Sequence, residues 1–480
     1  MKKQNFLRLL ILLMLTLAFT TQSLNAAPKN DNGRKNAAQS AELKLDQKQY
    51  SVDELKALAN QYRNARNNLG LVAVLKIWTE KEPRRFDIRL ELGAIYISQN
   101  KLIDAAQVLN EASSIIPSDE APHRLLAQIY KSQGNDSLRY LHLVKAASLA
   151  KRNWENQYNL GMYHASKGQN QKAEAFLINT MELKPGFAAA KFEYAKLMLE
   201  KDDVESAFRK FDEALLIEPE NYVYMAFYAY AAAISGRATV SSGNIREALK
   251  FAPRNPQALR MAGLIHMYNG NISAAEKSLR AAHRYSPTDA LVIESLGDAL
   301  AADFKFKEAC ANYLTAWQTA GYSERIAFKL GKTLSLDRKH REAKDFLEAI
   351  ASKSSKNGEA LYCLAEVYCE LGDMNRANAL VSRLSDGKNA VWRQLAQGRI
   401  HEARSDSDLA RTAYSAAYII APSNALVNAS LGRMLFKQGE IDSAIAFFEA
   451  AGALDPANIN NIIDKARAYE KKGDHADAIS

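Results

Sequence analysis

Prolines recur in this chain at a fixed interval of 34 residues, in three runs: Pro83 and Pro117; Pro185, Pro219, Pro253 and Pro287; and Pro422 and Pro456. The gap from Pro287 to Pro422 is 135 residues, one short of four intervals. A constant period of this length indicates a chain built from repeated units, each too small to bury its own apolar surface. Stacking of successive units is therefore predicted.

Small side chains recur with the same period. A Leu-Gly pair or a small-residue equivalent is found at Leu92-Gly93, Leu126-Ala127, Leu160-Gly161, Ala262-Gly263, Leu296-Gly297, Leu330-Gly331, Leu364-Ala365 and Leu431-Gly432. Twelve residues after the Gly or Ala comes an alanine, among them Ala105, Ala173, Ala207, Ala275, Ala309, Ala343, Ala377 and Ala444. Two antiparallel helices approach closely where small residues meet, so we expect each Gly or Ala to face the alanine that follows.

This pattern resembles the tetratricopeptide repeat (TPR), a helix-turn-helix unit of 34 residues. The resemblance covers about residues 52–480. It implies an all-α fold, an α-solenoid with a right-handed superhelical twist, made of about 12–13 units. It also implies that the first helix of each unit lines a concave groove, where TPR proteins commonly hold a partner peptide or segment.

Residues 1–27 have the pattern of a secretory signal peptide. Lys2, Lys3 and Arg8 precede an apolar run over residues 9–19, which is shorter than the roughly 20 residues needed to cross a bilayer. The short Lys-rich start is typical of bacteria, so we predict export, with the periplasm as destination. The alternative is an uncleaved N-terminus that anchors the chain to the inner membrane. Residues 28–51 are polar and predict a disordered linker.

The predicted array has an N-terminal part, residues 52–350, and a C-terminal part, residues 351–480, with a flexible Ser/Lys-rich joint near Ser352. The gap from Pro287 to Pro422 is one residue short of four intervals. To account for that residue, we expect the unit starting at Gly358 to be three residues short. The unit around Leu395-Ala396 would then carry two extra residues between His401 and Leu409. The last unit stops at Ser480 in a predicted helix, which favours truncation from a longer protein.

Composition argues against several functions. The formal charge of +9 comes from 63 basic and 54 acidic residues that are mixed along the chain, so nucleic-acid binding is not indicated. Cys310, Cys363 and Cys369 are too few for a disulfide scaffold, and we expect buried free thiols, the alternative being a redox or metal role. No nucleophile elbow, paired-histidine zinc motif or glycine-rich dinucleotide loop occurs. We predict neither enzyme activity nor a metal or cofactor.

The TPR resemblance assigns the groove floor to positions two, five, six, nine, twelve and thirteen of each unit. In three central units these positions include Phe192, Lys196, Phe227, Tyr230, Met261, Leu264, Met267 and Tyr268. Contiguous apolar and aromatic residues of this kind mark partner sites, so we predict a partner-binding groove here. The alternative is that these residues pack on one another. A second cluster, Glu359, Glu366 and Glu370, is expected to be a solvated acidic face.

Three functions remain open. The first is a non-catalytic protein-protein interaction scaffold in the bacterial cell envelope, with a partner peptide or segment in the groove and membrane contact only through an uncleaved signal. The second is the periplasmic TPR superhelix of an exopolysaccharide export system, binding export components, with its barrel beyond residue 480. The third is the TPR region of an enzyme whose catalytic domain lies beyond that residue.

Overall fold

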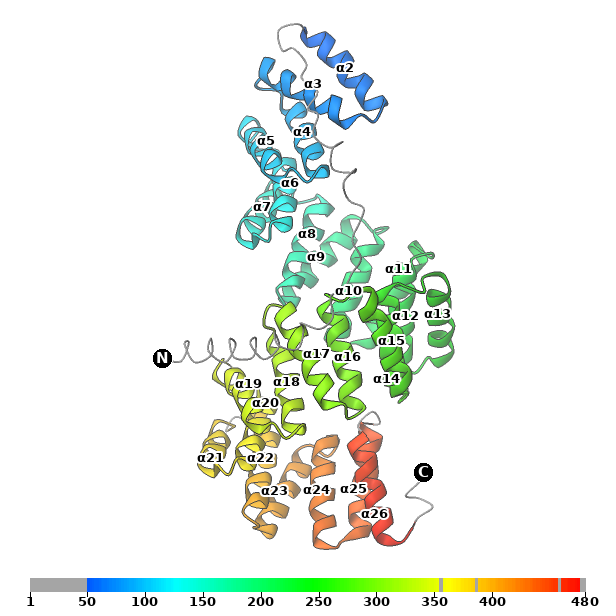
Figure 1. The fold of residues 1–480 in the computed structure, drawn as a ribbon, viewed down its shortest axis with the longest axis vertical. Coiled ribbons are helices and arrows are strands. Elements are labelled where there is room, and N and C mark those ends of the chain that lie inside the picture. The colour runs from blue at the N-terminus through cyan, green and yellow to red at the C-terminus, as the bar shows by residue number, and fades with distance from the viewer. Residues whose placement is uncertain (1–49, 354–356, 385–386, 456–458, 475–480) are drawn as a thin grey trace, which may run out of the picture. The chain divides into compact units, whose positions relative to one another are not determined.

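A computed structural model describes residues 50–353, 357–384, 387–455 and 459–474, and within these ranges every regular element is a helix. The chain divides into two compact units, one up to Lys151 and one from Arg152 onward. The first contains α2 (Val52–Asn64), α3 (Asn68–Lys81), α4 (Phe86–Ser98), α5 (Leu102–Ile115), α6 (Ala121–Ser132) and α7 (Asp136–Leu149). These helices are labelled in Figure 1.

The second unit continues the series. Its first ten helices are α8 (Trp154–Ser166), α9 (Asn170–Leu183), α10 (Ala188–Glu200), α11 (Val204–Ile217), α12 (Tyr222–Ile234), α13 (Ala238–Phe251), α14 (Pro256–Tyr268), α15 (Ile272–Tyr285), α16 (Ala290–Ala302) and α17 (Phe306–Thr319). The remainder are α18 (Glu324–Leu336), α19 (His340–Lys353), α20 (Gly358–Glu370), α21 (Met374–Arg383), the short 3₁₀ helix η1 (Gly387–Asn389), α22 (Ala390–Ala403), α23 (Ser407–Ile420), α24 (Ala425–Gln438), α25 (Ile441–Leu454) and α26 (Ile459–Lys472).

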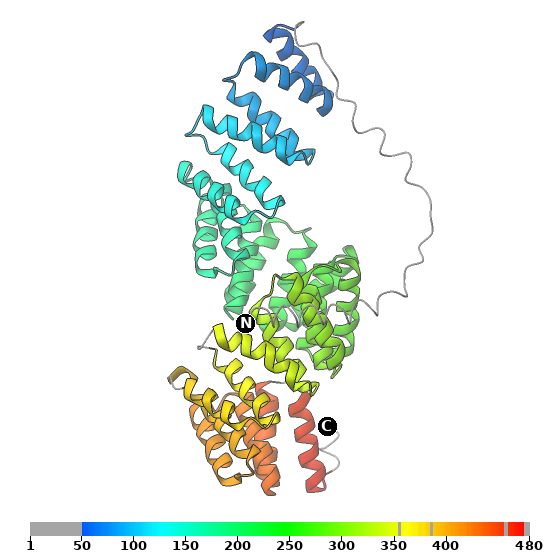
Figure 2. The same ribbon diagram turned by 60° about the vertical axis from the view of Figure 1, so that its left-hand side comes forward.

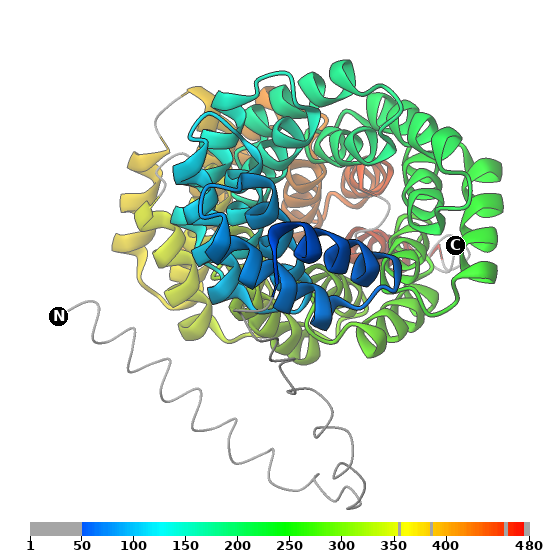
Figure 3. The ribbon, with the colours of Figure 1, turned by 90° about the horizontal axis from the view of Figure 1, so that it is seen from above.

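The all-α prediction and the pairing of helices are confirmed. The described residues form twelve helix pairs, α2–α3 to α24–α25, followed by α26. In the second unit, the second helix of each pair contacts the first helix of the next pair, as α17 does α18, and some first helices also contact each other, as α12 does α14 and α20 does α22. The pairs therefore follow one another in a curve (Figure 3). At its C-terminal end, α24, α25 and α26 lie side by side (Figure 2).

Local sequence signals begin and end these helices. At α14 the Asn255 side chain accepts hydrogen bonds from the backbone N–H groups of Gln257 and Ala258, while Pro256 occupies the first turn. The turn after α14 passes through Gly270 at φ +75°, in the left-handed region that glycine enters without steric cost. The predicted turn at Gly270 is therefore confirmed, and it reverses the chain into α15.

The close approach of paired helices depends on glycine, but not in the way that the sequence suggested. A Cβ atom added to Gly263 would lie 2.5 Å from Cγ of Leu279, sixteen residues further along. Gly93, Gly161, Gly297, Gly331 and Gly432 likewise face a large residue of the second helix sixteen positions on. The expectation that glycine faces the recurring alanine is wrong. Glycine instead makes room for a leucine or an aromatic ring.

The same contact corrects the predicted register of one unit. Gly398 faces Tyr414, again sixteen residues on, and Ala410 follows Gly398 at the regular spacing of twelve. This unit is therefore regular, and the expected extra residues between His401 and Leu409 do not exist. Instead, α21 has only 10 residues, where α19 has 14, and η1 completes the connection to α22. One deletion near α21 accounts for the missing residue.

Several predicted segments lie outside the described residues. These are the signal peptide, most of the linker, residues 354–356 beside the predicted joint, and residues 475–480 of the last unit. The joint near Ser352 falls inside the second compact unit, whereas the division of the chain follows Lys151. Across the described ranges, no helix combines the length and the apolar character that crossing a membrane requires.

Candidate functional site

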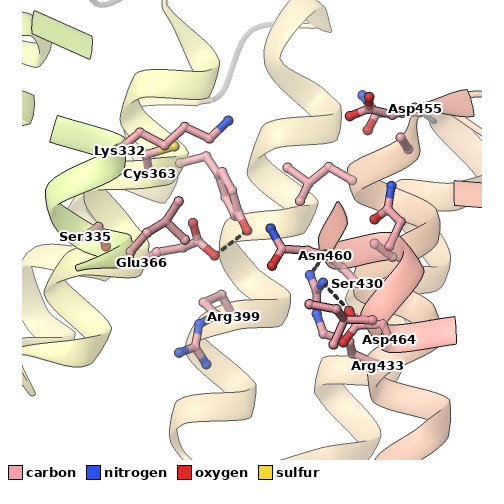
Figure 4. Close-up of a pocket in the computed structure, with 18 of the residues that line it drawn as sticks. Lys332, Ser335, Cys363, Glu366, Arg399, Ser430, Arg433, Asp455, Asn460 and Asp464 are labelled. Atoms are coloured by element: carbon pink, nitrogen blue, oxygen red, sulfur yellow. Dashed lines mark hydrogen bonds and ion pairs between the residues drawn. The ribbon is translucent and has the colours of Figure 1, made fainter. Parts of the chain in front are cut away.

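A cavity of about 1220 Å³ opens in the second unit among the first helices α18, α20, α22, α24 and α26. We call it the C-terminal groove. Figure 4 shows that the side chains labelled in it come from opposite walls: Lys332, Ser335, Cys363 and Glu366 from α18 and α20, Arg399 from α22, and Ser430, Arg433, Asn460 and Asp464 from α24 and α26. The groove is thus made by five successive repeats.

Helical periodicity explains why these residues share one surface. On α20, Tyr362 and Cys363 follow Glu359 by three and four residues and Glu366 follows it by seven, so these side chains lie along one face of the helix. They occupy positions two, five, six and nine of their unit. Four of the positions that the TPR resemblance assigns to a groove floor therefore line a groove on α20, downstream of the partner site predicted from the sequence.

Ion pairs join each first helix of this region to the next, and we call the series the charge ladder. From α18 to α26 its rungs are Lys332–Glu359 at 3.3 Å, Arg399–Glu370, Lys437–Glu402, and Arg433–Asp464 at 3.1 Å. Between α16 and α18, Arg325 pairs with Glu294, and Lys329 pairs with Glu294 at 2.8 Å and with Asp298 at 2.7 Å. Most charges on this surface are thus balanced by the neighbouring repeat.

Glu402 shows how complete this balance can be. Its carboxylate pairs with Lys437, receives a hydrogen bond from the Tyr414 hydroxyl at 3.0 Å, and lies 3.4 Å from Arg399. Burial alone would favour the neutral acid, but these three donors outweigh it and lower the pKa of Glu402. Glu402 is therefore held as a carboxylate.

Glu366 is in a different situation. Among the described residues it makes no ion pair, and its carboxyl group accepts one hydrogen bond, from the Tyr362 hydroxyl at 2.6 Å. Burial raises the pKa of Glu366, while the hydrogen bond from Tyr362 and the more distant Arg399, Arg433 and Lys332 act in the opposite direction. The side chain lies toward the groove (Figure 4). The middle of the groove therefore presents a carboxyl group without a cationic partner.

The three cysteines are free and buried, as predicted. Cys363 lines the C-terminal groove, and burial raises the pKa of its thiol well above the ordinary range. Burial also raises the pKa of Cys310 and of Cys369, each to about 11. Thiols of this kind are poor nucleophiles. In the part of the chain that the structure describes, no group of three or more His, Cys, Asp and Glu side chains is placed to hold a metal ion.

Three of the apolar residues predicted as the partner-binding groove lie inside the protein. Phe192, Phe227 and Met261 are buried, and the Phe192 ring centroid is 4.4 Å from that of Tyr224 and 4.9 Å from that of Phe227. The alternative, in which these residues pack on one another, describes all three. They are core residues of the second unit and do not form an open floor.

The other members of that predicted set are more accessible. Tyr230, Leu264 and Met267 are half-buried, the Lys196 side chain is 37% exposed, and Tyr268 is 53% exposed. Partner binding by these residues stays a prediction. The row of small and charged residues at the groove positions of α18 to α24 is the sequence signal that could have located the C-terminal groove. Small or ion-paired side chains leave a groove open, whereas large rings such as those of Phe192 and Phe227 fill it.

Comparison with known proteins agrees with the helix pairing. Residues 395–459 match the tetratricopeptide repeat family. This part of the chain carries tetratricopeptide repeats. Over 311 residues it is 24% identical to the BBSome complex member BBS4 of Bos taurus, a match that covers 64% of this chain and 52% of BBS4. The chain thus spans about half the length of the curated relative that it matches.

Two solved structures are similar to this chain. A tetratricopeptide repeat protein from Parabacteroides merdae ATCC 43184 is 16% identical with a TM-score of 0.42, and the match covers 52% of this chain and 98% of that protein. Human IFIT1, solved as a dimer with PPP-AAAA, is 14% identical with a TM-score of 0.45, covering 84% of this chain and 94% of IFIT1.

Proposed function

We propose that this TPR protein is a non-catalytic scaffold that binds an extended segment of a partner protein in its C-terminal groove. The observation that carries the proposal is the groove itself, about 1220 Å³ in volume and spread over five successive first helices. Pockets for small molecules are usually about 300–1,000 Å³. A longer, polar groove made of repeats suits a peptide, whose backbone and side chains can contact several helices in turn.

The comparisons support a protein partner. TPR arrays are interaction modules, and the relative BBS4 is named as a member of a complex. The charges of the groove lining also support it, because cations and anions alternate between helices and no single sign dominates. Such a surface favours a partner segment of mixed charge over a polyanion.

A photo-crosslinking amino acid tests the location of the contact. We place it at Leu336, which lines the groove and is 49% exposed, and at Leu216, which is 75% exposed and lies outside the groove lining. Cells that express the protein should yield a crosslinked partner from position 336 and not from position 216. Crosslinking at 216 alone, or equal crosslinking at both positions, would show that the groove is not the binding site.

We further propose that the scaffold acts in the bacterial cell envelope. The support is the basic start, short apolar run and small residues of residues 1–27. Fusing residues 1–49 to alkaline phosphatase, which is active only after export, tests this location. An active fusion is expected. An inactive fusion with an intact reporter would reject the proposed location without affecting the groove.

A further inference from the structure

We infer that Glu366 binds a Lys or Arg side chain of the segment in the C-terminal groove. The inference rests on the proposed function and specifies the chemistry of the partner: an extended peptide with a basic residue at one fixed position. The first observation concerns the three acids of α20. Glu359 pairs with Lys332, and Glu370 pairs with Arg399. Among the residues that the structure describes, Glu366 accepts a hydrogen bond from Tyr362 alone.

The cations around Glu366 already have partners. Arg399 pairs with Glu370 and lies 3.4 Å from Glu402, while Arg433 lies 3.1 Å from Asp464 and donates to the Ser430 hydroxyl at 3.2 Å. Movement of either arginine to Glu366 would leave another carboxylate unpaired, which is costly in a partly buried site. A cation supplied by a ligand avoids that loss.

The surroundings of Glu366 suit the long side chain of a basic residue. The rings of Tyr362 and Trp392 lie with their centroids 5.8 Å apart, and both residues line the groove together with Cys363 and Leu426. Aromatic rings attract a cation through their faces, and apolar atoms pack against the methylene groups of Lys or Arg. A carboxyl group next to two aromatic rings therefore forms a receptor for an ammonium or guanidinium group.

A bare metal ion is a poorer match for this site. Tight binding of a divalent cation requires several oxygen, nitrogen or sulfur ligands, and the described residues contain no such group. An anionic ligand is a poor match too, since Arg399 and Arg433 are occupied. The carboxyl group of Glu366 and its neighbours thus favour a cation carried on a side chain.

Defined peptides test the inference. Random 12-residue peptides are selected by display on the full chain, and the affinities of the selected peptides are measured by fluorescence anisotropy. We expect the peptides to share a Lys or Arg, and exchange of that residue for Gln should weaken binding at least about tenfold. Glu366→Gln should weaken binding of the parent peptide by a similar factor.

The matched control is Glu440→Gln, which removes the carboxylate of the ion pair with Arg411 outside the groove lining. It should change affinity less than about threefold. On the Glu366→Gln protein, exchange of the basic residue in the peptide should have almost no further effect, because the two substitutions remove one interaction. Circular dichroism confirms that each variant is folded.

A failure of the role proposed for Glu366 can be distinguished from a failure of the proposed scaffold function. If the selected peptides bind in the groove but share no basic residue, or if Glu366→Gln binds as tightly as the wild type, the role of Glu366 is refuted and the groove scaffold stands. If the display yields no peptide that binds the wild type, or if every selected peptide still binds after Trp392→Ala and Glu366→Gln are combined in a folded protein, the proposed function fails as well.

Discussion

Gly263→Ala tests the contact on which the packing of helix pairs depends. The added Cβ atom would lie 2.5 Å from Cγ and 2.9 Å from Cδ2 of Leu279, and Leu279 is completely buried. Carbon atoms pack at about 3.5–4.0 Å. Either α14 and α15 must separate or Leu279 must leave its preferred rotamer, so the substitution strains the pair although alanine is the better helix former.

The expected change in the free energy of unfolding on Gly263→Ala follows from two opposing contributions. Alanine in place of glycine stabilises a helix interior by about 1 kcal/mol. An extra methyl group in a closely packed core costs about 1–3 kcal/mol, and the upper half of that range applies when the neighbour is fully buried. We therefore expect Gly263→Ala to lower the free energy of unfolding by about 1–2 kcal/mol.

Two further variants separate packing from helix propensity. Gly243 lies inside α13, and nothing lies within 4 Å of a Cβ atom added there, so Gly243→Ala should stabilise the protein by about 0.5–1 kcal/mol. Leu279→Ala alone should cost about 2–5 kcal/mol. In that background Gly263→Ala should become stabilising, because its methyl group enters the space that Leu279 has left.

Denaturant unfolding followed by circular dichroism measures these differences. A repeat array need not unfold in one step, so hydrogen exchange of the α14 and α15 amides is measured in parallel. Two results would refute the reasoning: Gly263→Ala as stable as Gly243→Ala, or the same cost of Gly263→Ala with and without Leu279. Either would mean that the glycine does not provide room for the leucine.

Three other predictions concern the two surfaces described above. Glu366→Gln should raise the melting temperature near pH 7.5 but not near pH 4. Burial raises the pKa of the Glu366 carboxyl, so its ionisation destabilises the folded state as pH rises. Equal shifts of the melting temperature at both pH values would contradict this. Cys363 should react slowly with iodoacetamide until the protein is unfolded, since burial raises the pKa of its thiol, and mass spectrometry of the labelled protein checks this. Phe227→Ser should cost about 3–5 kcal/mol, whereas Tyr268→Ser should change stability by less than about 0.5 kcal/mol; thermal melts that show equal effects would place Phe227 outside the core.

Much of the fold could be predicted because its determinants are local and periodic. The recurrence of glycine, alanine and proline gave the number of units and the helix-turn-helix pairing. The unit around Gly398 was misplaced, since Leu395 and Ala396 imitate the Leu-Ala signature and are both fully buried. The position of Tyr414 against Gly398 decides for the register in which Ala410 follows Gly398 by twelve residues. That contact joins two helices, and a single helix sequence does not contain it.

The candidate site was harder to predict for a similar reason. Positions two, five, six and nine of α20 line the C-terminal groove, but the accessibility of such a position depends on what neighbouring repeats place beside it. Phe192 and Phe227 fill their own groove with aromatic rings, and the sequence shows only that both are apolar. Glu359, Glu366 and Glu370 were recognised as an acidic cluster. Which of them lacks a cation depends on the arrangement of three helices.

The charge ladder also determines how the second unit responds to its solvent. Every rung joins two successive first helices, and rungs such as Arg433–Asp464 are partly exposed, so dissolved ions compete with them. The apolar contacts between each glycine and its leucine or aromatic partner do not weaken in this way. Rising salt therefore weakens the ion pairs between successive first helices, while the apolar contacts within each helix pair keep their strength.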